Sequence, residues 1–289
     1  MTTSVGPSQT ALMAAAARAA HPIVDGEPLI FADPLAETLL GDVADELIDY
    51  HRKHGRHLVL AGARAQVTCR SRYTEDLLAA AVDRGVDQYV LLGAGLDSFA
   101  YRSPLAQRIR TFELDAPGTQ RWKRDRVATA GLATPAGLRY VPVDLERDNL
   151  TDALRSAGFD PTRPAVLSWL GVLMYLTRPA LEATLAQLGR FAPGTRLVLD
   201  HMVPAELRDE AGQTYVDLVG PTSADRGEPW RTFLAPDELA DLLTRHGFTA
   251  VESTDQRELF AAHGWERDWL RPSTLTRLAS ATIGGGPQE

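Results

Sequence analysis

Residues 89–102 read YVLLGAGLDSFAYR, a short apolar run followed by a glycine-rich turn. The run Tyr89–Leu92 is bounded by glycine, which is typical of a buried parallel strand. Gly93, Ala94 and Gly95 follow, and glycine allows the backbone to turn sharply and to approach a ligand closely. A helix is expected over residues 99–108. The pattern predicts the opening strand, loop and helix of an α/β unit.

The next apolar run, residues 109–114, is followed by Asp115. A carboxylate at the end of the second strand of such a unit commonly accepts hydrogen bonds from the two hydroxyls of a ribose. A nicotinamide fingerprint requires a third glycine and a helix N-terminus that is free for a pyrophosphate, but this chain has Asp97 and Ser98 there. S-Adenosylmethionine, which carries ribose and adenine without phosphate, fits better. The residues therefore predict an adenosine-containing cofactor, with a nicotinamide dinucleotide as the alternative.

The stretch GAGLDSFAYR resembles the GAGLDTRAYR signature of the leucine carboxyl methyltransferase family, which includes polyketide carboxyl O-methyltransferases. Looser matches follow the same order along the chain, from about residue 10 to about residue 283. They are DPLAETLL at 33–40, RSRYTEDLL at 70–78, FELDAPGTQRWKR at 112–124, YVPVDL at 140–145, LGVLMYLT at 170–177 and GEPWRTFLAPDELADLLTRHGF at 227–248. The resemblance implies methyl transfer from S-adenosylmethionine, with S-adenosylhomocysteine as the product.

Strand-like and helix-like segments alternate along the chain, which predicts a parallel sheet with helices on both faces. Strands are expected at 88–93, 109–114, 138–143, 164–170, 195–201 and 248–253, and helices at 99–108, 117–130, 149–157, 177–191 and 235–246. The resemblance implies that residues 276–283 add an antiparallel strand. The result would be the seven-stranded, mostly parallel sheet of the Rossmann-like class I methyltransferase fold.

The remaining segments are expected to surround this core. Residues 1–62 are predicted to form an N-terminal helical cap, with helices at 9–20 and 35–50 and with Asp33 as the N-cap of the second. A further helix, 63–84, opens the methyltransferase core at 63–283. Residues 203–232 do not fit the alternation and are predicted to form a lid, and residues 284–289 a flexible tail.

Ligands of such sheets lie beyond the carboxyl ends of the strands. Gly93 and Gly95 end the first strand, Asp115 the second and Asp144 the third. Any one of them could be only a turn residue, but their shared position favours a ligand site. We expect Asp115 to hold the ribose. Asp144 is expected to accept a hydrogen bond from the adenine amino group, with Leu145 packing on the ring.

The resemblance also implies a partner for the methionine end of the cofactor. Arg70 matches the first arginine of the family's R-x-R stretch, which binds the methionine carboxylate, and a guanidinium matches a carboxylate bidentately. A solvent-exposed arginine is the alternative. Many family members have glutamate where this chain has Leu170. A cofactor contact made by that glutamate is therefore absent or replaced, and Leu170 is retained as a cofactor-lining position.

Two side chains are candidates for catalysis. His201 ends the fifth predicted strand on the substrate side, where it could act as a general base or only cap the strand. Tyr175 could line the acceptor pocket or belong to the core. His51, His54 and His57 lack the carboxylate or cysteine partners of a metal shell, so we interpret them as solvated and predict no metal.

Composition narrows the possible partners. The net charge is −8 with no basic block, which argues against nucleic acid or an anionic membrane. The single cysteine, Cys69, indicates a reducing compartment, so a cytoplasmic location is expected. The resemblance predicts that the chain methylates an oxygen of a small molecule, namely a carboxylate of a secondary metabolite. The alternatives are methylation of a phenol or another hydroxyl, nitrogen or carbon of a natural product, nicotinamide-dependent oxidoreduction, and cofactor binding without catalysis.

Overall fold

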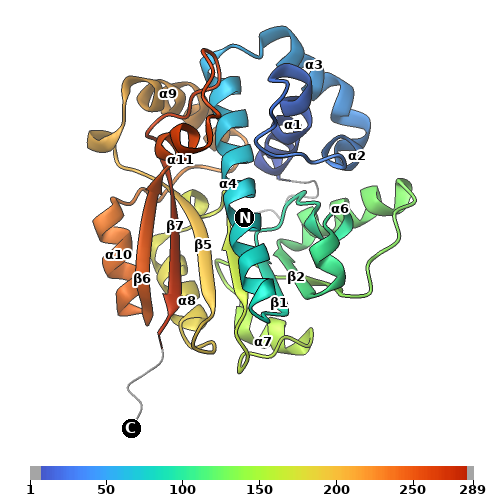
Figure 1. The fold of residues 1–289 in the computed structure, drawn as a ribbon, viewed down its shortest axis with the longest axis vertical. Helices are drawn as coiled ribbons and strands as arrows, with labels where there is room; N and C mark the ends of the chain where they lie inside the picture. Colours follow the sequence, from blue (N-terminus) through green and yellow to red (C-terminus); the bar gives the residue numbers. More distant parts are fainter. Residues whose placement is uncertain (1–7, 285–289) are drawn as a thin grey trace.

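A seven-stranded sheet runs through the computed structural model, which describes residues 8–284 (Figure 1). The strands are β1 (Gln88–Leu92), β2 (Arg110–Asp115), β3 (Leu138–Pro142), β4 (Val166–Trp169), β5 (Arg196–Met202), β6 (Phe248–Asp255) and β7 (Thr276–Ile283). Their spatial order is β3-β2-β1-β4-β5-β7-β6, and only β7 runs antiparallel to its neighbours. The predicted class I methyltransferase fold is confirmed.

Strand order changes direction between β1 and β4. The chain proceeds outward from β1 through β2 to β3, then returns to place β4 on the other side of β1. Every residue of β1 and of β4 is buried, which explains why these strands are continuous apolar runs rather than alternating ones. In open α/β sheets a crevice forms at such a switch point, outside the carboxyl ends of the strands.

Helices cover both faces of the sheet. One face carries α4 (Leu58–Asp83), α5 (Phe99–Arg102) and α6 (Pro117–Thr129), and the other carries α7 (Leu150–Ser156), α8 (Arg178–Leu188) and α10 (Pro236–Arg245). The second face forms the largest core, in which leucines of these three helices pack against Phe112 and Trp169. The helix α11 (Gln256–His263) packs against α4 and β7.

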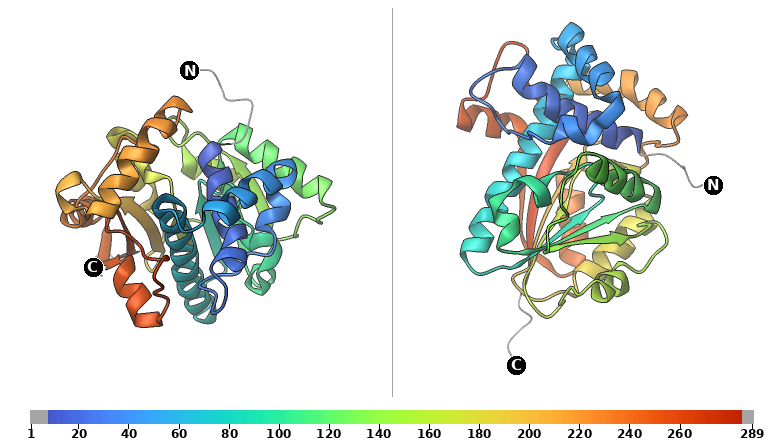
Figure 2. Two further views of the ribbon diagram at one scale, coloured as in Figure 1. Left: turned by 90° about the horizontal axis from the view of Figure 1, so that it is seen from above. Right: turned by 90° about the vertical axis from the view of Figure 1, so that its right-hand side faces the viewer.

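A second group of helices lies beyond the carboxyl ends of the parallel strands (Figures 1 and 2). It comprises α1 (Gln9–Val24), α2 (Ala36–Leu40), α3 (Ala44–His54) and α9 (Glu210–Asp225). A buried ion pair fastens α1 to the core, because Arg64 of α4 donates to both carboxylate oxygens of Asp25, at 2.7 and 3.0 Å. Arg18 of α1 also donates to the carbonyl of Leu96, at 2.7 Å. These contacts place α1 over the glycine loop.

The structure corrects the prediction of one helix at 35–50. Gly41 has a φ of +59°, so the segment divides into α2, a 3₁₀ turn over Gly41–Val43, and α3. Asp33 is not the N-cap, which is Leu35. Asp33 is buried instead, and accepts hydrogen bonds from Arg18 at 2.8 Å and from Ser98 at 2.5 Å.

Two other expected helices differ in detail. The helix expected at 63–84 begins earlier, at Leu58, and the one at 99–108 is only α5 followed by a 3₁₀ turn over Pro104–Gln107. The sequence did not predict α9 or α11. The predicted tail lies outside the described residues except for Gly284, whose amide donates to the Gly247 carbonyl at 3.3 Å.

Candidate active site

The glycine loop and the end of β2 are locked together. Gly93 and Gly95 have φ values of +72° and +51°, and a side chain at Gly93 would collide with Val172. The Gly95 amide donates to Asp115 Oδ2 at 2.5 Å, and the Ala116 amide donates to Asp115 Oδ1 at 2.7 Å. Each carboxylate oxygen keeps a further lone pair, so the loop fixes Asp115 as an acceptor for a vicinal diol.

Burial raises the pKa of Asp115, while the two backbone hydrogen bonds lower it in part. The neighbouring Asp97 accepts from the Phe99 amide at 2.7 Å and so serves the start of α5. Asp97 thus caps this helix start, as the sequence suggested, and its carboxylate would repel a phosphate. The loop thus presents an acid for hydroxyl groups and no site for an anion.

The end of β3 lies beside the end of β2, because the Val143 amide donates to the Asp115 carbonyl at 2.9 Å. Asp144 follows, with about half of its side chain exposed, and accepts from the Glu146 amide at 3.0 Å. Leu145 is partly buried against the main core. A polar acceptor and an apolar surface therefore adjoin the ribose-side acid, which suits an adenine ring.

Arg70 of α4 reaches the opposite side of the switch point. Its side chain is only 12% exposed, and Nη1 donates to Asp200 Oδ2 at 2.9 Å. The edge of its guanidinium points at Gly171, where an added Cβ would be 2.6 Å from Nη2 and 2.8 Å from Nη1. Gly171 has a φ of +70°, and its amide donates to Asp200 Oδ1 at 2.5 Å. Arg70 is therefore mostly buried and paired with Asp200, which rules out the solvent-exposed alternative.

Asp200 is a site residue that sequence reasoning missed. It is fully buried near the end of β5 and connects α4 to the loop after β4 through both carboxylate oxygens. Leu170, next to Gly171, is partly buried and offers no polar side-chain group. The sequence did carry a signal for Asp200, because an acid near the end of an apolar strand is the same pattern that singled out Asp115. No spacing in the sequence linked it to Arg70.

His201, the next residue of β5, lies in a different environment. It is 1% exposed, and Nδ1 lies 3.0 Å from the carbonyl of Leu234. A carbonyl can only accept, so Nδ1 carries the proton and Nε2 does not. Nε2 is buried without a hydrogen-bond partner among residues 8–284. Burial lowers the pKa of His201 to about 4. A pKa this far below neutral pH makes His201 a weak base, and its burial keeps it from solvent, which together disfavour the general-base interpretation.

Tyr175 is part of what we call the aromatic cluster, a group of apolar side chains beyond the ends of β4 and β5. Its members are Met174, Tyr175, Met202, Tyr215, Val216, Trp230, Phe233 and Leu275. The rings of Tyr215, on α9, and Trp230 are stacked, with centroids 6.3 Å apart and planes at 11°. Burial raises the pKa of Tyr175 and raises that of Tyr215 to about 12, so both hydroxyls stay protonated at neutral pH.

The first turn of α1 closes over these elements. The Thr10 amide donates to Glu228 Oε2 at 3.1 Å, and the Ser8 amide donates to Thr119 Oγ1 of α6 at 3.3 Å. A Cβ at Gly95 would lie 3.2 Å from the Cβ of Ala11. The segment after α9 and the first turn of α1 thus meet above the glycine loop. Glu228 is a second residue that the sequence did not single out.

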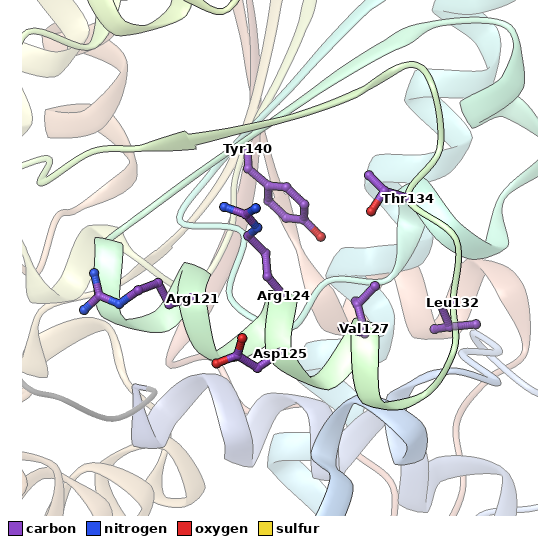
Figure 3. Close-up of a pocket in the computed structure, with 8 residues that line it drawn as sticks. Arg121, Arg124, Asp125, Val127, Leu132, Thr134 and Tyr140 are labelled. Atoms are coloured by element: carbon purple, nitrogen blue, oxygen red, sulfur yellow. The ribbon is translucent and has the colours of Figure 1, made fainter.

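One surface hollow lies elsewhere. Figure 3 shows it between α6, the loop that follows α6, and Tyr140 of β3. Arg121 and Arg124 line it, with the Arg124 guanidinium 5.5 Å from the centre of the Tyr140 ring. None of the predicted site residues lines this hollow, so it is separate from the candidate active site.

The histidines considered for a metal are not all solvated, which corrects that part of the interpretation. His51 is buried, with Nδ1 3.2 Å from Arg64 Nη1, and burial lowers its pKa to about 4. His57 accepts from the Val59 amide at the start of α4. Between residues 8 and 284, no group of three or more histidine, cysteine or acidic side chains could hold a metal ion. The same residues include no helix with the length and apolar character needed to cross a membrane.

Comparisons with known proteins find a matching family model and similar sequences. A family model described as "Leucine carboxyl methyltransferase" matches residues 11–189. The "Putative S-adenosyl-L-methionine-dependent methyltransferase YktD" of Bacillus subtilis (strain 168) is 29% identical over 267 residues, which cover 85% of this chain and 87% of that protein. A protein of Mycobacterium sp. (strain KMS), named "Putative S-adenosyl-L-methionine-dependent methyltransferase", is 38% identical over 273 residues, covering 86% of this chain and 89% of its own.

Solved structures share the fold at low identity. One described as a "putative methyltransferase from Thermobifida fusca" has a TM-score of 0.59 at 17% identity and covers 98% of this chain and 97% of its own. A DUF574 family protein from Streptomyces avermitilis has a TM-score of 0.57 at 20% identity, and the match covers 92% of this chain and 96% of that protein.

Proposed function

Because the chain belongs to the leucine carboxyl methyltransferase family and is an S-adenosylmethionine-dependent methyltransferase, we propose that its acceptor is a carboxylate oxygen of a small molecule. In this proposal the acceptor is an acid of secondary metabolism. Residues 203–232, which include α9, form the lid above it.

The residues present suit the cofactor at three places. Arg70 would hold the methionine carboxylate, since only its Nη1 is engaged with Asp200 and the guanidinium has further donors. Asp115 would hold the ribose hydroxyls with the lone pairs that the Gly95 and Ala116 amides leave free. Asp144 and Leu145 would receive the adenine. When bound, S-adenosylmethionine supplies an electrophilic methyl group that an acceptor oxygen displaces from sulfur.

The observation that carries the choice of a carboxylate is the lack of a usable base among the residues predicted to act. His201 is neutral, buried and hydrogen-bonded to Leu234, and its pKa is lowered to about 4. The pKa values of Tyr175 and Tyr215 are raised. A carboxylic acid, with an ordinary pKa of about 4, is already ionised at neutral pH and needs no proton removed. A phenol, near about 10, would need a base.

The protein then contributes alignment and exclusion of water. The aromatic cluster adjoins α4, the helix of Arg70, because Tyr215 of α9 packs near Gly62, so in this proposal the methionine end of the cofactor would face apolar side chains. Positioning two reactants and removing water suffice to accelerate an in-line displacement. Proton transfer is not required in this mechanism.

The test is turnover with methyl-labelled S-adenosylmethionine and matched pairs of aryl acids and phenols. We expect labelled ester from the acids, and mild alkali should release the label as methanol. An alkali-stable product formed only from phenols, together with a loss of ~10²–10⁴-fold on His201→Ala, would replace this proposal with phenol methylation. In calorimetry, S-adenosylhomocysteine should bind and NAD should not.

A further inference from the structure

The indole N–H of Trp230 is a buried donor without an acceptor. Its Nε1 has no solvent contact and makes no hydrogen bond to any residue in the described part of the chain. Nε1 lies near enough to the Tyr175 hydroxyl to lower the pKa of Tyr175, against the larger effect of burial, but the two do not meet the geometry of a hydrogen bond. An indole can only donate. A buried donor that lacks a partner is costly, so its retention calls for an explanation.

The position of Trp230 distinguishes it from a core tryptophan. Trp169 also has a buried Nε1 without a partner, but it lies within β4 among the aliphatic side chains of the main core. Trp230 is partly exposed and follows Glu228, which binds the first turn of α1 above the glycine loop. Its ring belongs to the aromatic cluster. Trp230 therefore adjoins the site, whereas Trp169 does not.

The methionine end of the site faces the same cluster. Helix α4, which carries Arg70, packs against α9, which carries Tyr215. Tyr215 also approaches α4, because a Cβ at Gly62 would lie 3.8 Å from its ring. A methyl group carried between Arg70 and Asp115 would therefore be directed toward Trp230, Tyr175 and Tyr215.

We propose that Trp230 determines acceptor specificity by donating its indole N–H to an oxygen of a flat, aryl-bearing acid. This inference rests on the proposed carboxylate methylation and names the class of acid. The donor suits the carboxylate oxygen that is not methylated, whereas a neutral amine has a single lone pair, which must stay free to attack the methyl group. The parallel rings of Tyr215 and Trp230 favour a planar body over a bulky aliphatic one.

The experiment measures binding of a naphthoic acid and of a saturated acid of similar volume to the protein saturated with S-adenosylhomocysteine. Trp230→Phe keeps an aromatic ring but removes the donor. We expect this variant to bind the naphthoic acid at least tenfold more weakly and to have a KM raised by a similar factor. Its affinity for S-adenosylhomocysteine should stay within twofold of the parent's. Tyr215→Leu should reduce the preference for the flat acid. Trp122→Phe removes an indole from α6 and is the control. It should change neither the affinity for the naphthoic acid nor the preference for the flat acid.

A direct readout uses the protein with ¹⁵N-labelled indoles. The chain has five tryptophans, and the signal absent from Trp230→Phe is that of Trp230. Addition of the acid should shift this signal downfield. If the parent binds and methylates aryl acids but Trp230→Phe changes their affinity by less than twofold, the inference is wrong and the proposed function stands. If the parent methylates the saturated acid but binds and methylates no aryl acid, only the inference is wrong, and if it methylates no acid at all, both are wrong.

Discussion

Replacing Gly171 by alanine tests the way Arg70 is held. Gly171 has a φ of +70°, and its new Cβ would lie 2.6 Å from Nη2 and 2.8 Å from Nη1 of Arg70. An alanine in the left-handed region costs roughly 1–2 kcal/mol of folding free energy. The guanidinium must also move by roughly 1 Å to restore an ordinary contact distance. Such a shift removes a charge-assisted contact of about 1.5–3 kcal/mol, which corresponds to roughly ten- to 150-fold in affinity.

A matched control separates backbone strain from displacement of Arg70. Gly131 has a φ of +67°, and nothing lies within 4 Å of the position of its Cβ. Gly131→Ala should therefore lower the thermal midpoint through the same strain without affecting the site. We expect calorimetry to show weaker S-adenosylhomocysteine binding for Gly171→Ala only.

The choice of ligand supplies the second control. 5′-Methylthioadenosine has the adenine and ribose but lacks the methionine carboxylate, so both variants should bind it like the parent. Equal S-adenosylhomocysteine affinities for Gly171→Ala and Gly131→Ala would refute the assignment of Arg70 to the carboxylate. An equal loss of 5′-methylthioadenosine binding in Gly171→Ala would show a collapsed site instead.

Three further results are expected. Asp115→Asn should weaken the binding of S-adenosylhomocysteine and of 5′-methylthioadenosine alike, by about tenfold or more in calorimetry, because both ligands carry the ribose. An unchanged affinity for either ligand would contradict the assignment of Asp115 to the ribose. Asp200→Asn should weaken only S-adenosylhomocysteine, and should cost about 3–5 kcal/mol in denaturant titrations because it breaks a buried ion pair; an unchanged affinity would mean that Arg70 needs no support. The pKa values of His51 and His201 fall to about 4 in the folded protein, below the ordinary value near 6.5. The folded protein is therefore more stable above pH 6.5, where both side chains are neutral, and it loses up to roughly 3 kcal/mol of unfolding free energy for each histidine as the pH falls toward 4, because the unfolded chain takes up protons first. His201→Gln should flatten the measured dependence of unfolding free energy on pH between 6.5 and 4, and a parent protein equally stable across that window would contradict the burial argument.

The strands were predictable because their signals are local. Each buried strand is an apolar run of a few residues next to a turn, and glycine or an acid follows the run where the chain meets a ligand. Asp115 shows the strength of this rule, since its place at the end of β2 follows from the residues around it. The class of cofactor could be predicted for the same reason, because Asp97 excludes a phosphate at the helix start.

The parts that the sequence did not predict depend on contacts between distant residues. Arg70 and Asp200 are 130 positions apart, and no periodicity links them. Thr10 and Glu228 are 218 positions apart, and their contact appears only when α1 and α9 both lie above the sheet. The break at Gly41 has a similar origin. A glycine in a helical pattern is often tolerated, and here tertiary packing selects the positive φ.

The position of β7 has a consequence for synthesis of the protein. This strand, Thr276–Ile283, comes after every other strand in the chain, yet it lies between β5 and β6 in the sheet. While a ribosome is still making the chain, the outer edge of β5 has no partner, and Asp200 and Arg70 are held on an unfinished sheet. Unpaired edges invite association between nascent chains. The outer edge of β5 therefore stays unpaired until residues 276–283 are available to pair with it.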